Sequence, residues 1–344
     1  MKFGRLLLGI GFAGALAAGT AVMPALASPE KPVIALSNAY YGNTWRHQMV
    51  ESFEAAAKQA KADGDIADYI ILNGDGTVAQ QNSQIAELIL KHVDAIAIDA
   101  ASETAVNGII EKACQAGIKV VTFDSVASAP CNYQLNFDFT GYKQKQAEWV
   151  LEHIGGKGNI IQVRGVQGSA PDHDMYEAQQ TVLAKYPDVK VVATVYGQAT
   201  ASVAQAAIAN VLPSLPKVDA VLAQGGSDDF GIARAFEQFG GQYADKMPVI
   251  EGGGSTDFIK WWADQREKNG YSTISMNTTP GIGGAAFYLT LDIVKGADPS
   301  KKLIMPVATV TNDNLGDYTS LPSGMIVSPT YTADWVKENL LGQH

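Results

Sequence analysis

The sequence predicts a doubly wound α/β fold, in which helices cover both faces of parallel β-sheets. Short apolar runs rich in β-branched residues alternate with helix-period segments along almost the whole chain after residue 32. Continuous runs of this kind are typical of strands buried on both faces of a parallel sheet. The chain has 344 residues, more than one core usually organises, so we expect either one very large sheet or two sheets.

Nine apolar runs are predicted as strands of this fold. A further short run, "NYQLNFD" at 132–138, follows a predicted strand without an intervening helix, and we interpret it as a candidate crossing between two sheets. The nine predicted strands are residues 33–37, 69–74, 95–99, 119–124, 159–165, 190–197, 220–225, 248–253 and 272–276.

Helix-period segments lie between these strands, for example at 77–92, 142–156 and 256–270. The last of them starts at Thr256, a residue type favoured at helix N-caps, and closes at Gly270. No Pro- or Ser-rich linker divides the sequence into independent domains. Two sheets would therefore require the chain to pass between two lobes more than once.

Residues 1–27 have the layout of a secretory signal peptide. Basic residues precede an apolar run that is broken by Gly and by Pro24, and the run ends in "ALA". We expect cleavage near Ala27–Ser28 and a periplasmic protein. A transmembrane anchor is the alternative interpretation, and it needs about 20 uninterrupted apolar residues.

Charge and cysteine content narrow the possible partners. The sequence has 35 Asp and Glu against 25 Lys and Arg, which argues against nucleic acid or anionic lipid as a partner. Cys114 and Cys131 flank the strand predicted at 119–124, and in an oxidising compartment we expect a disulfide, with two free buried thiols as the alternative. Two cysteines are too few for a structural zinc site, so we expect no metal and no cofactor.

Polar and aromatic side chains follow many of the predicted strands. Ligands of doubly wound folds bind outside the carboxyl ends of the strands, so these side chains are candidates for a binding site. Asp and Asn bind paired hydroxyl groups, Arg donates a planar fork, and an aromatic face covers the C–H side of a sugar ring. The candidate ligand-binding residues are Ser37, Asn43, Trp45, Arg46, Asp99, Asp124, Ser125, Asp174, Asp228, Glu251 and Asn277.

Three stretches resemble the periplasmic sugar-binding proteins of ABC transporters, in their type I ribose and galactofuranose-binding group. They are "IALSNAYYGNTWRHQMVESFEAAAKQAKADG", "LILKHVDAIAIDAASETAVNGIIEKACQAGIKVVTFDS" and "VDAVLAQGGSDDFGIARAF". The resemblance implies two doubly wound parallel-sheet lobes joined by a three-segment hinge. The N-terminal lobe would comprise 28–137 plus 277–306, and the C-terminal lobe 138–276 plus 307–344.

The resemblance also implies a function. We expect a monomeric receptor that captures a sugar and delivers it to the membrane permease of an ABC importer. A sensory receptor of the same fold is the main alternative, and a secreted carbohydrate-active enzyme is weaker because the sequence has no positioned nucleophile. The stretch "PGIGGAA" at 280–286 matches a dinucleotide fingerprint only loosely, and we interpret its glycines as tight helix packing.

Five residues match the family's binding positions. Ser37, Asn43, Trp45 and Arg46 fall on the first sugar-binding loop, and Asp124 falls on the Asp that commonly binds two sugar hydroxyls. We therefore expect "SNAYYGNTWRHQM" to form one wall of a closing cleft.

Ser125 stands where many members of the family have Arg, and three positions of the second lobe also depart from the family. Asp174 stands where the family has a sugar-binding Arg, Gly225 where an Asn is expected, and Gly253 where an Asp is expected. The second wall is therefore expected to be roomier, and also acidic, because of Asp172, Asp174, Asp228 and Glu251. Such a wall would favour a polyol, a cyclitol, an amino sugar or a larger glycoside, and disfavour anionic sugar acids.

Overall fold

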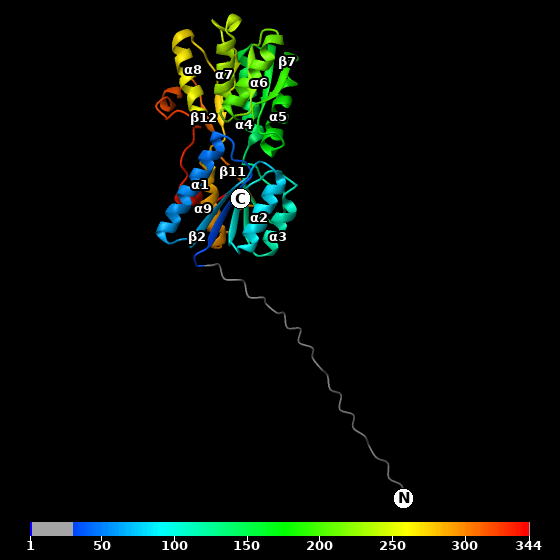
Figure 1. Cartoon of the computed structure of the whole chain (residues 1–344), viewed down its shortest axis with the longest axis vertical. Coiled ribbons are helices and arrows are strands. Elements are labelled where there is room, and N and C mark those ends of the chain that lie inside the picture. Colours follow the sequence, from blue (N-terminus) through cyan, green and yellow to red (C-terminus); the bar gives the residue numbers. More distant parts are fainter. Residues whose placement is uncertain (2–29, 344) are drawn as a thin grey trace.

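The computed structural model describes Met1 and residues 30–343, and it contains two α/β lobes stacked along the long axis of the molecule (Figure 1). The predicted signal peptide and its cleavage site fall within residues 2–29, outside the described part of the chain. None of the helices described is long and apolar enough to cross a membrane.

The first lobe is built on a six-stranded sheet with the order β11-β5-β4-β3-β1-β2, and all its neighbouring strands are parallel. Helices α1 (Thr44–Asp63) and α9 (Ile282–Val294) share a core on one face, and α2 (Val78–Leu90) and α3 (Asn107–Gln115) share a core on the other. The strands are β1 (Val33–Asn38), β2 (Asp68–Asn73), β3 (Ala95–Asp99), β4 (Lys119–Phe123), β5 (Tyr133–Phe137) and β11 (Lys302–Met305).

The second lobe is built on a four-stranded parallel sheet with the order β7-β6-β8-β9. Its strands are β6 (Lys157–Arg164), β7 (Asp188–Tyr196), β8 (Ala220–Ala223) and β9 (Val249–Ile250). Its helices are α4 (Phe139–His153), α5 (Ala170–Leu183), α6 (Ala201–Val211), α7 (Asp228–Phe239) and α8 (Thr256–Asn269). Helices α4 and α5 pack on one face, and α6, α7 and α8 contribute to a core on the other. Two parallel sheets covered on both faces confirm the predicted fold class.

The chain passes between the lobes at three places that the resemblance implied. The first passage follows β5 at the predicted crossing, the second runs through β10 (Ser275–Asn277), and the third joins β11 to β12 (Ala308–Val310). Strands β10 and β12 pair with each other in antiparallel register. The second and third passages therefore form one hydrogen-bonded ribbon between the lobes.

A fourth passage follows the 3₁₀ turn at Leu315–Tyr318, and we call residues 322–331 the C-terminal strap (Figure 1, red). On the second lobe, the backbone N–H of Val327 donates to the carbonyl of Gly254 at 2.8 Å. On the first lobe, the N–H of Ile326 donates to the side-chain oxygen of Gln48 at 2.7 Å. The strap is therefore hydrogen-bonded to both lobes.

The residues after the strap pack with the first lobe. Helix α10 (Ala333–Asn339) lies against α9, and Val336 and Leu340 belong to the same core cluster as Phe53 of α1. The lobe boundaries remain a proposed division, but placing all of 307–344 in the second lobe is wrong for this final segment. Its apolar side chains complete the core under α1 and α9.

Two local predictions have different outcomes. Ser255, not Thr256, is the N-cap of α8, because its hydroxyl accepts from the N–H of Phe258, while the Thr256 hydroxyl donates to the carbonyl of Pro322 at 2.8 Å. The interpretation of "PGIGGAA" as tight packing is confirmed, since a Cβ at Gly283 would collide with the backbone carbonyl of Met49 in α1.

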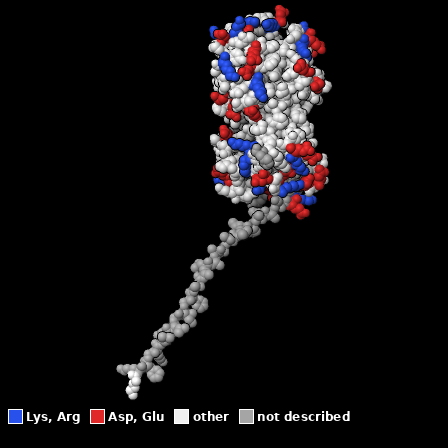
Figure 2. Space-filling model, turned by 180° about the vertical axis from the view of Figure 1, so that it is seen from behind, with Lys and Arg blue, Asp and Glu red and all other residues white. Residues whose placement is uncertain are grey.

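Charged side chains of both signs are interspersed over the two lobes on the face drawn in Figure 2. The sequence carries a formal net charge of −10 at pH 7. Mixed surface charge of this kind is typical of a solvated surface.

Cys114 and Cys131 form the predicted disulfide, which joins the end of α3 to the loop before β5. Replacing both cysteines with Ala is expected to lower the free energy of unfolding by about 3 kcal/mol, because the disulfide reduces the conformational entropy of the unfolded chain. Urea unfolding of the oxidised parent and the variant measures the difference. Identical midpoints and slopes would contradict the prediction, and the reduced parent should behave like the variant.

Candidate functional site

A cavity lies between the lobes and holds about 590 Å³ of empty space, part of which is open to solvent. It sits at the carboxyl ends of the strands of both sheets, where ligands of doubly wound folds bind. Its lining residues are Asn43, Trp45, Arg46, Asp124, Phe139, Tyr142, Gly165, Val166, Ser169, Pro171, Asp172, Met175, Ala199, Gln224, Gly225, Gly226, Asn277 and Thr278.

The cap of α1 places the two large side chains of the first wall. The Asn43 side chain accepts a hydrogen bond from the backbone N–H of Arg46 at 2.9 Å, which fixes the first turn of the helix. Trp45 then donates its indole N–H to the carbonyl of Thr278, on the second passage between the lobes, at 3.0 Å. The Trp45 ring is thus held at the junction of the first lobe and the hinge.

Arg46 is a buried cation that ties together the ends of three neighbouring strands. It donates to Asn38 of β1 at 3.2 Å, forms an ion pair with the fully buried Asp99 of β3, and lies 3.8 Å from the carboxylate of Asp124, just after β4. Burial lowers the pKa of Arg46, and the charge of Asp124 opposes that effect. The ion pairs compensate a guanidinium that would otherwise be costly to bury.

Asp124 presents its carboxylate to the cavity from a strained backbone position. Its φ of 55° lies in the left-handed region, which few residues other than Gly, Asn and Asp adopt. Burial raises the pKa of Asp124 to about 6, although the charge of Arg46 works in the opposite direction. Asp124 therefore keeps its proton to a higher pH than an exposed Asp, and above a pH of about 6 its carboxylate is a hydrogen-bond acceptor.

The second wall is organised by an ion pair that sequence reasoning missed. Arg164, the last residue of β6, donates from Nε and Nη2 to both carboxylate oxygens of Asp172 at 3.0 and 2.7 Å. Gln224 accepts from the N–H of Gly165 at 2.7 Å and donates to the carbonyl of Asp172 at 3.0 Å. An Arg at the carboxyl end of a predicted parallel strand was the available signal, because such strand ends face the ligand site.

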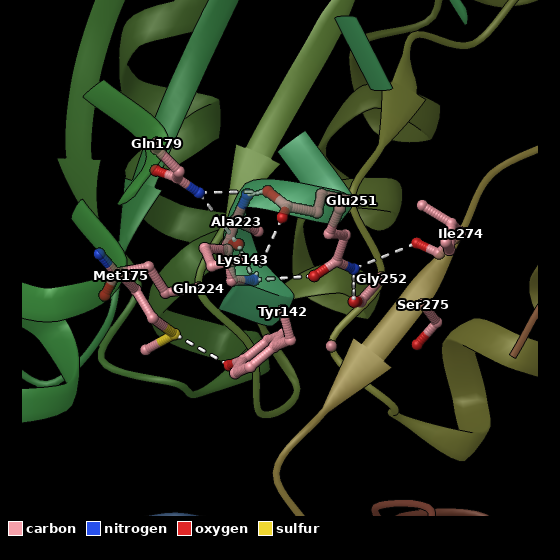
Figure 3. Close-up of polar contacts among 12 residues, drawn as sticks. Tyr142, Lys143, Met175, Gln179, Ala223, Gln224, Glu251, Gly252, Ile274 and Ser275 are labelled. Carbon is pink, nitrogen blue, oxygen red and sulfur yellow. Dashed lines mark hydrogen bonds and ion pairs between the residues drawn. The ribbon is translucent and has the colours of Figure 1, made fainter. Parts of the chain in front are cut away.

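A fully buried ion pair lies behind this wall (Figure 3). Lys143 of α4 donates to Glu251 at 3.1 Å, to Gln146 at 3.0 Å and to the carbonyl of Ala223 at 2.9 Å. Glu251 in turn accepts from the N–H of Ala223 at 2.8 Å and from Gln179 at 3.2 Å. Side chains therefore bond both the N–H and the carbonyl of Ala223, the last residue of β8, just before the chain enters the cavity lining at Gln224.

The same network reaches the hinge. Gln146 accepts from Lys143 and donates to the carbonyls of Gly252, at 2.6 Å, and Ile274, at 3.2 Å (Figure 3). Ile274 directly precedes β10, the second passage between the lobes. The second wall and the hinge thus share one set of hydrogen bonds.

Comparison with known proteins places this architecture. A family model described as a periplasmic binding protein domain matches residues 34–298. This chain belongs to the periplasmic binding protein family.

Individual relatives agree with that assignment. The crystal structure of an ABC transporter solute-binding protein from Thermobispora bispora is 39% identical, with a TM-score of 0.84 over 90% of this chain and 95% of that chain. The xylitol-binding protein of Mycolicibacterium smegmatis is 26% identical over 273 residues, 78% of this chain and 74% of the relative. The crystal structure of a galactofuranose-binding protein is 17% identical with a TM-score of 0.75 over 84% of this chain and 97% of that chain, which shows a shared fold.

The structure of this binding protein brings together five of the candidate residues predicted from sequence. They line the cavity and are Asn43, Trp45, Arg46, Asp124 and Asn277. Three others lie behind the first wall. Asp99 holds Arg46, Ser37 donates to Gln84 at 2.9 Å, and Ser125 is fully buried.

The remaining three candidates do not line the cavity, so the expected acidic second wall is a wrong prediction. Glu251 is neutralised by Lys143, and Asp228 accepts from the N–H of Thr200 at 2.8 Å near the start of α6. Asp174 lies two residues beyond Asp172 on α5, a spacing that turns it away from the face Asp172 occupies. The one carboxylate that this wall presents, Asp172, is paired with Arg164.

The glycines expected to enlarge the second wall act differently from each other. A Cβ at Gly253 would lie 2.5 Å from the Cα of Gly225, so the backbone itself fills that space. Gly225 lines the cavity, and a Cβ there would meet no atom within 4 Å. Only Gly225 therefore adds room to the cavity. The described residues also contain no cluster of His, Cys, Asp or Glu suited to a metal ion.

The raised pKa of Asp124 predicts how stability depends on pH. The native state keeps this proton up to a pH of about 6, whereas the reference value is 3.8, so its contribution to the free energy of unfolding falls as pH rises between these values. Asp124→Asn removes this term and suits the positive φ. The parent should lose stability relative to the variant from about pH 4 to pH 6, by about 1.4 kcal/mol per unit of pKa displacement. Urea titrations across that range measure it, and a constant difference would contradict the prediction.

Proposed function

We propose that this protein is a periplasmic receptor that binds a neutral sugar or polyol between its two lobes and delivers it to the permease of an ABC importer. The observation that supports this most directly is the first wall, where Arg46 and Asp124 meet beside Trp45 in a cavity lined by both lobes. A carboxylate and a guanidinium bind vicinal hydroxyl groups, and the indole face covers the C–H side of the ligand.

The named ligands of relatives support the ligand class. One curated relative is a xylitol-binding protein, and another, 28% identical over 202 residues, is a multiple sugar-binding periplasmic receptor. The chain covers 56% of the second relative's length. A periplasmic location is part of the proposal. The absence of catalysis is also part of it, because the residues that line the cavity include no nucleophile with an adjacent base.

Most charges at the cavity are paired with each other, which favours a neutral ligand over an anionic one. Arg46 is paired with Asp99, and Asp172 with Arg164, which leaves Asp124 as the acceptor for ligand hydroxyls. The expected acidic second wall would have suited an amino sugar as well as a polyol or cyclitol and repelled a sugar acid, but three of its four carboxylates do not line the cavity. We therefore place polyols, cyclitols and neutral sugars ahead of charged ligands.

A thermal-shift screen of sugars, polyols, cyclitols, amino sugars and sugar acids tests the proposal. A ligand that binds only the folded protein raises the stability by about 2.7 kcal/mol at a concentration of 100 times its Kd. Asp124→Asn should lose most of the shift. Asp174→Asn removes a carboxylate outside the cavity and should keep it. No shift with any neutral ligand, or the largest shift with a sugar acid, would contradict the proposal.

Transport and sensing are separated by an uptake assay. Deleting the gene should abolish accumulation of the radiolabelled ligand found in the screen, and restoring it should recover uptake. Normal uptake in the deletion strain would contradict the importer role.

A further inference from the structure

The two walls of the cavity differ in how many of their polar groups already form hydrogen bonds within the protein. On the second lobe, Ser169 donates to the carbonyl of Val166 at 2.8 Å and accepts from the N–H of Asp172 at 3.3 Å. Asp172 receives both of its side-chain bonds from Arg164. Gln224 uses its oxygen and its nitrogen within the wall. These groups already make hydrogen bonds within the wall, so they offer a ligand fewer sites than unpaired side chains would.

The remaining side chains of the second wall are apolar, with one exception. Phe139, Val166, Pro171 and Met175 present carbon and sulfur to the cavity. The exception is the hydroxyl of Tyr142, which donates to the Met175 sulfur at 3.0 Å (Figure 3). A thioether is a weak acceptor, so this hydroxyl is free to turn to one ligand oxygen.

The first wall has the opposite character. The carboxylate of Asp124 accepts no hydrogen bond from the described residues, and its nearest cation, Arg46, lies 3.8 Å away. The Asn43 side chain uses its oxygen as the cap of α1, which leaves its NH₂ group for the cavity. Acceptors and donors for hydroxyl groups are therefore concentrated on the first lobe.

We propose that the site selects a neutral sugar that carries vicinal hydroxyls at the end held by the first lobe and a methyl or deoxy position at the end held by the second lobe. This inference rests on the proposed function and specifies its ligand. Tyr142 can bond one ligand oxygen on this wall, but a second hydroxyl buried against Met175 and Pro171 would lose its bonds to water without replacement, whereas a methyl group gains from burial there.

Titration calorimetry with matched sugars tests the inference. The pairs are D-galactose with D-fucose, D-glucose with 6-deoxy-D-glucose, and L-mannose with L-rhamnose, each differing by one hydroxyl. In every pair that binds, the deoxy sugar should bind at least about fivefold more tightly, since one unpaired hydroxyl costs about 1–3 kcal/mol. Equal or weaker binding of the deoxy sugars overturns the inference and leaves the proposed function intact. If only polyols bind, the inference also fails, and if no neutral ligand binds, both fail.

Two variants at one position locate the preference. Met175→Gln adds an amide in nearly the same volume and should reverse the preference within each pair, because the amide bonds the extra hydroxyl. Met175→Leu keeps the wall apolar and should retain the preference for the deoxy sugar. Each ratio is measured within one variant, so a change in folded fraction does not alter it. A preference unchanged in Met175→Gln overturns the assignment of the second wall.

Discussion

Replacing Lys143 with Met is expected to lower the free energy of unfolding by about 3–5 kcal/mol, because it leaves the carboxylate of Glu251 buried without its cation. Both side chains of this ion pair are 0% exposed. Burial raises the pKa of Glu251 and lowers that of Lys143, and their mutual attraction opposes both effects. Urea unfolding at pH 7 measures the loss.

Two further variants identify the cause. Lys143→Met combined with Glu251→Leu removes both charges, and it should recover much of the stability, since a hydrophobic pair often replaces a buried ion pair at little cost. Lys58→Met removes an exposed cation paired with Glu54 at 2.9 Å and should leave the stability nearly unchanged. A double variant as unstable as Lys143→Met would show that packing, not the uncompensated charge, is responsible.

Replacing Arg46 with Met is expected to weaken ligand binding by about 2 kcal/mol or more, roughly 30-fold, because a buried ligand loses its donor and Asp124 loses its neighbouring cation. The same change leaves Asp99 buried without its partner, so the unliganded protein should lose about 3–5 kcal/mol of stability. Calorimetry with the ligand from the screen measures the first effect, and urea unfolding measures the second.

The two effects separate in a double variant. Adding Asp99→Asn to Arg46→Met removes the unpaired carboxylate, which should restore stability without restoring affinity. Arg234→Met is a control, because Arg234 pairs with Glu237 on the exposed surface of α7 and should affect neither quantity. A double variant that regains the parent's affinity would exclude Arg46 from ligand binding.

The strands that could be predicted from sequence are those with continuous β-branched runs. Strands β11 and β12 were missed, because β11 begins at Lys302 and alternates between exposed and buried residues, and Pro306 separates it from β12. The predicted strand at 248–253 shrinks to Val249–Ile250, since the Glu251 side chain bonds the backbone of Ala223. Local sequence does not reveal such a competition between a side chain and the sheet ladder.

The site could be predicted from sequence only on the first lobe. Asn43, Trp45 and Arg46 lie in one short stretch, so their convergence follows from a single helix start. On the second lobe, Glu251 pairs with Lys143, 108 residues away, and Arg164 pairs with Asp172 across the turn from β6 to α5. Which charged residue faces the cavity and which pairs with another charge depends on the tertiary fold. The local sequence pattern does not determine it.

The return of the chain to the first lobe has a consequence for the order of assembly. Phe53 and Val336 share one core although almost the whole described chain separates them. A chain emerging N-terminus first would finish the second lobe while the first still lacks the helix that covers α9. Contacts of such long sequence separation form slowly and leave apolar surface exposed meanwhile. The first lobe is therefore the part expected to need chaperone protection during folding, and a fusion after residue 343 needs a spacer long enough to let α10 dock.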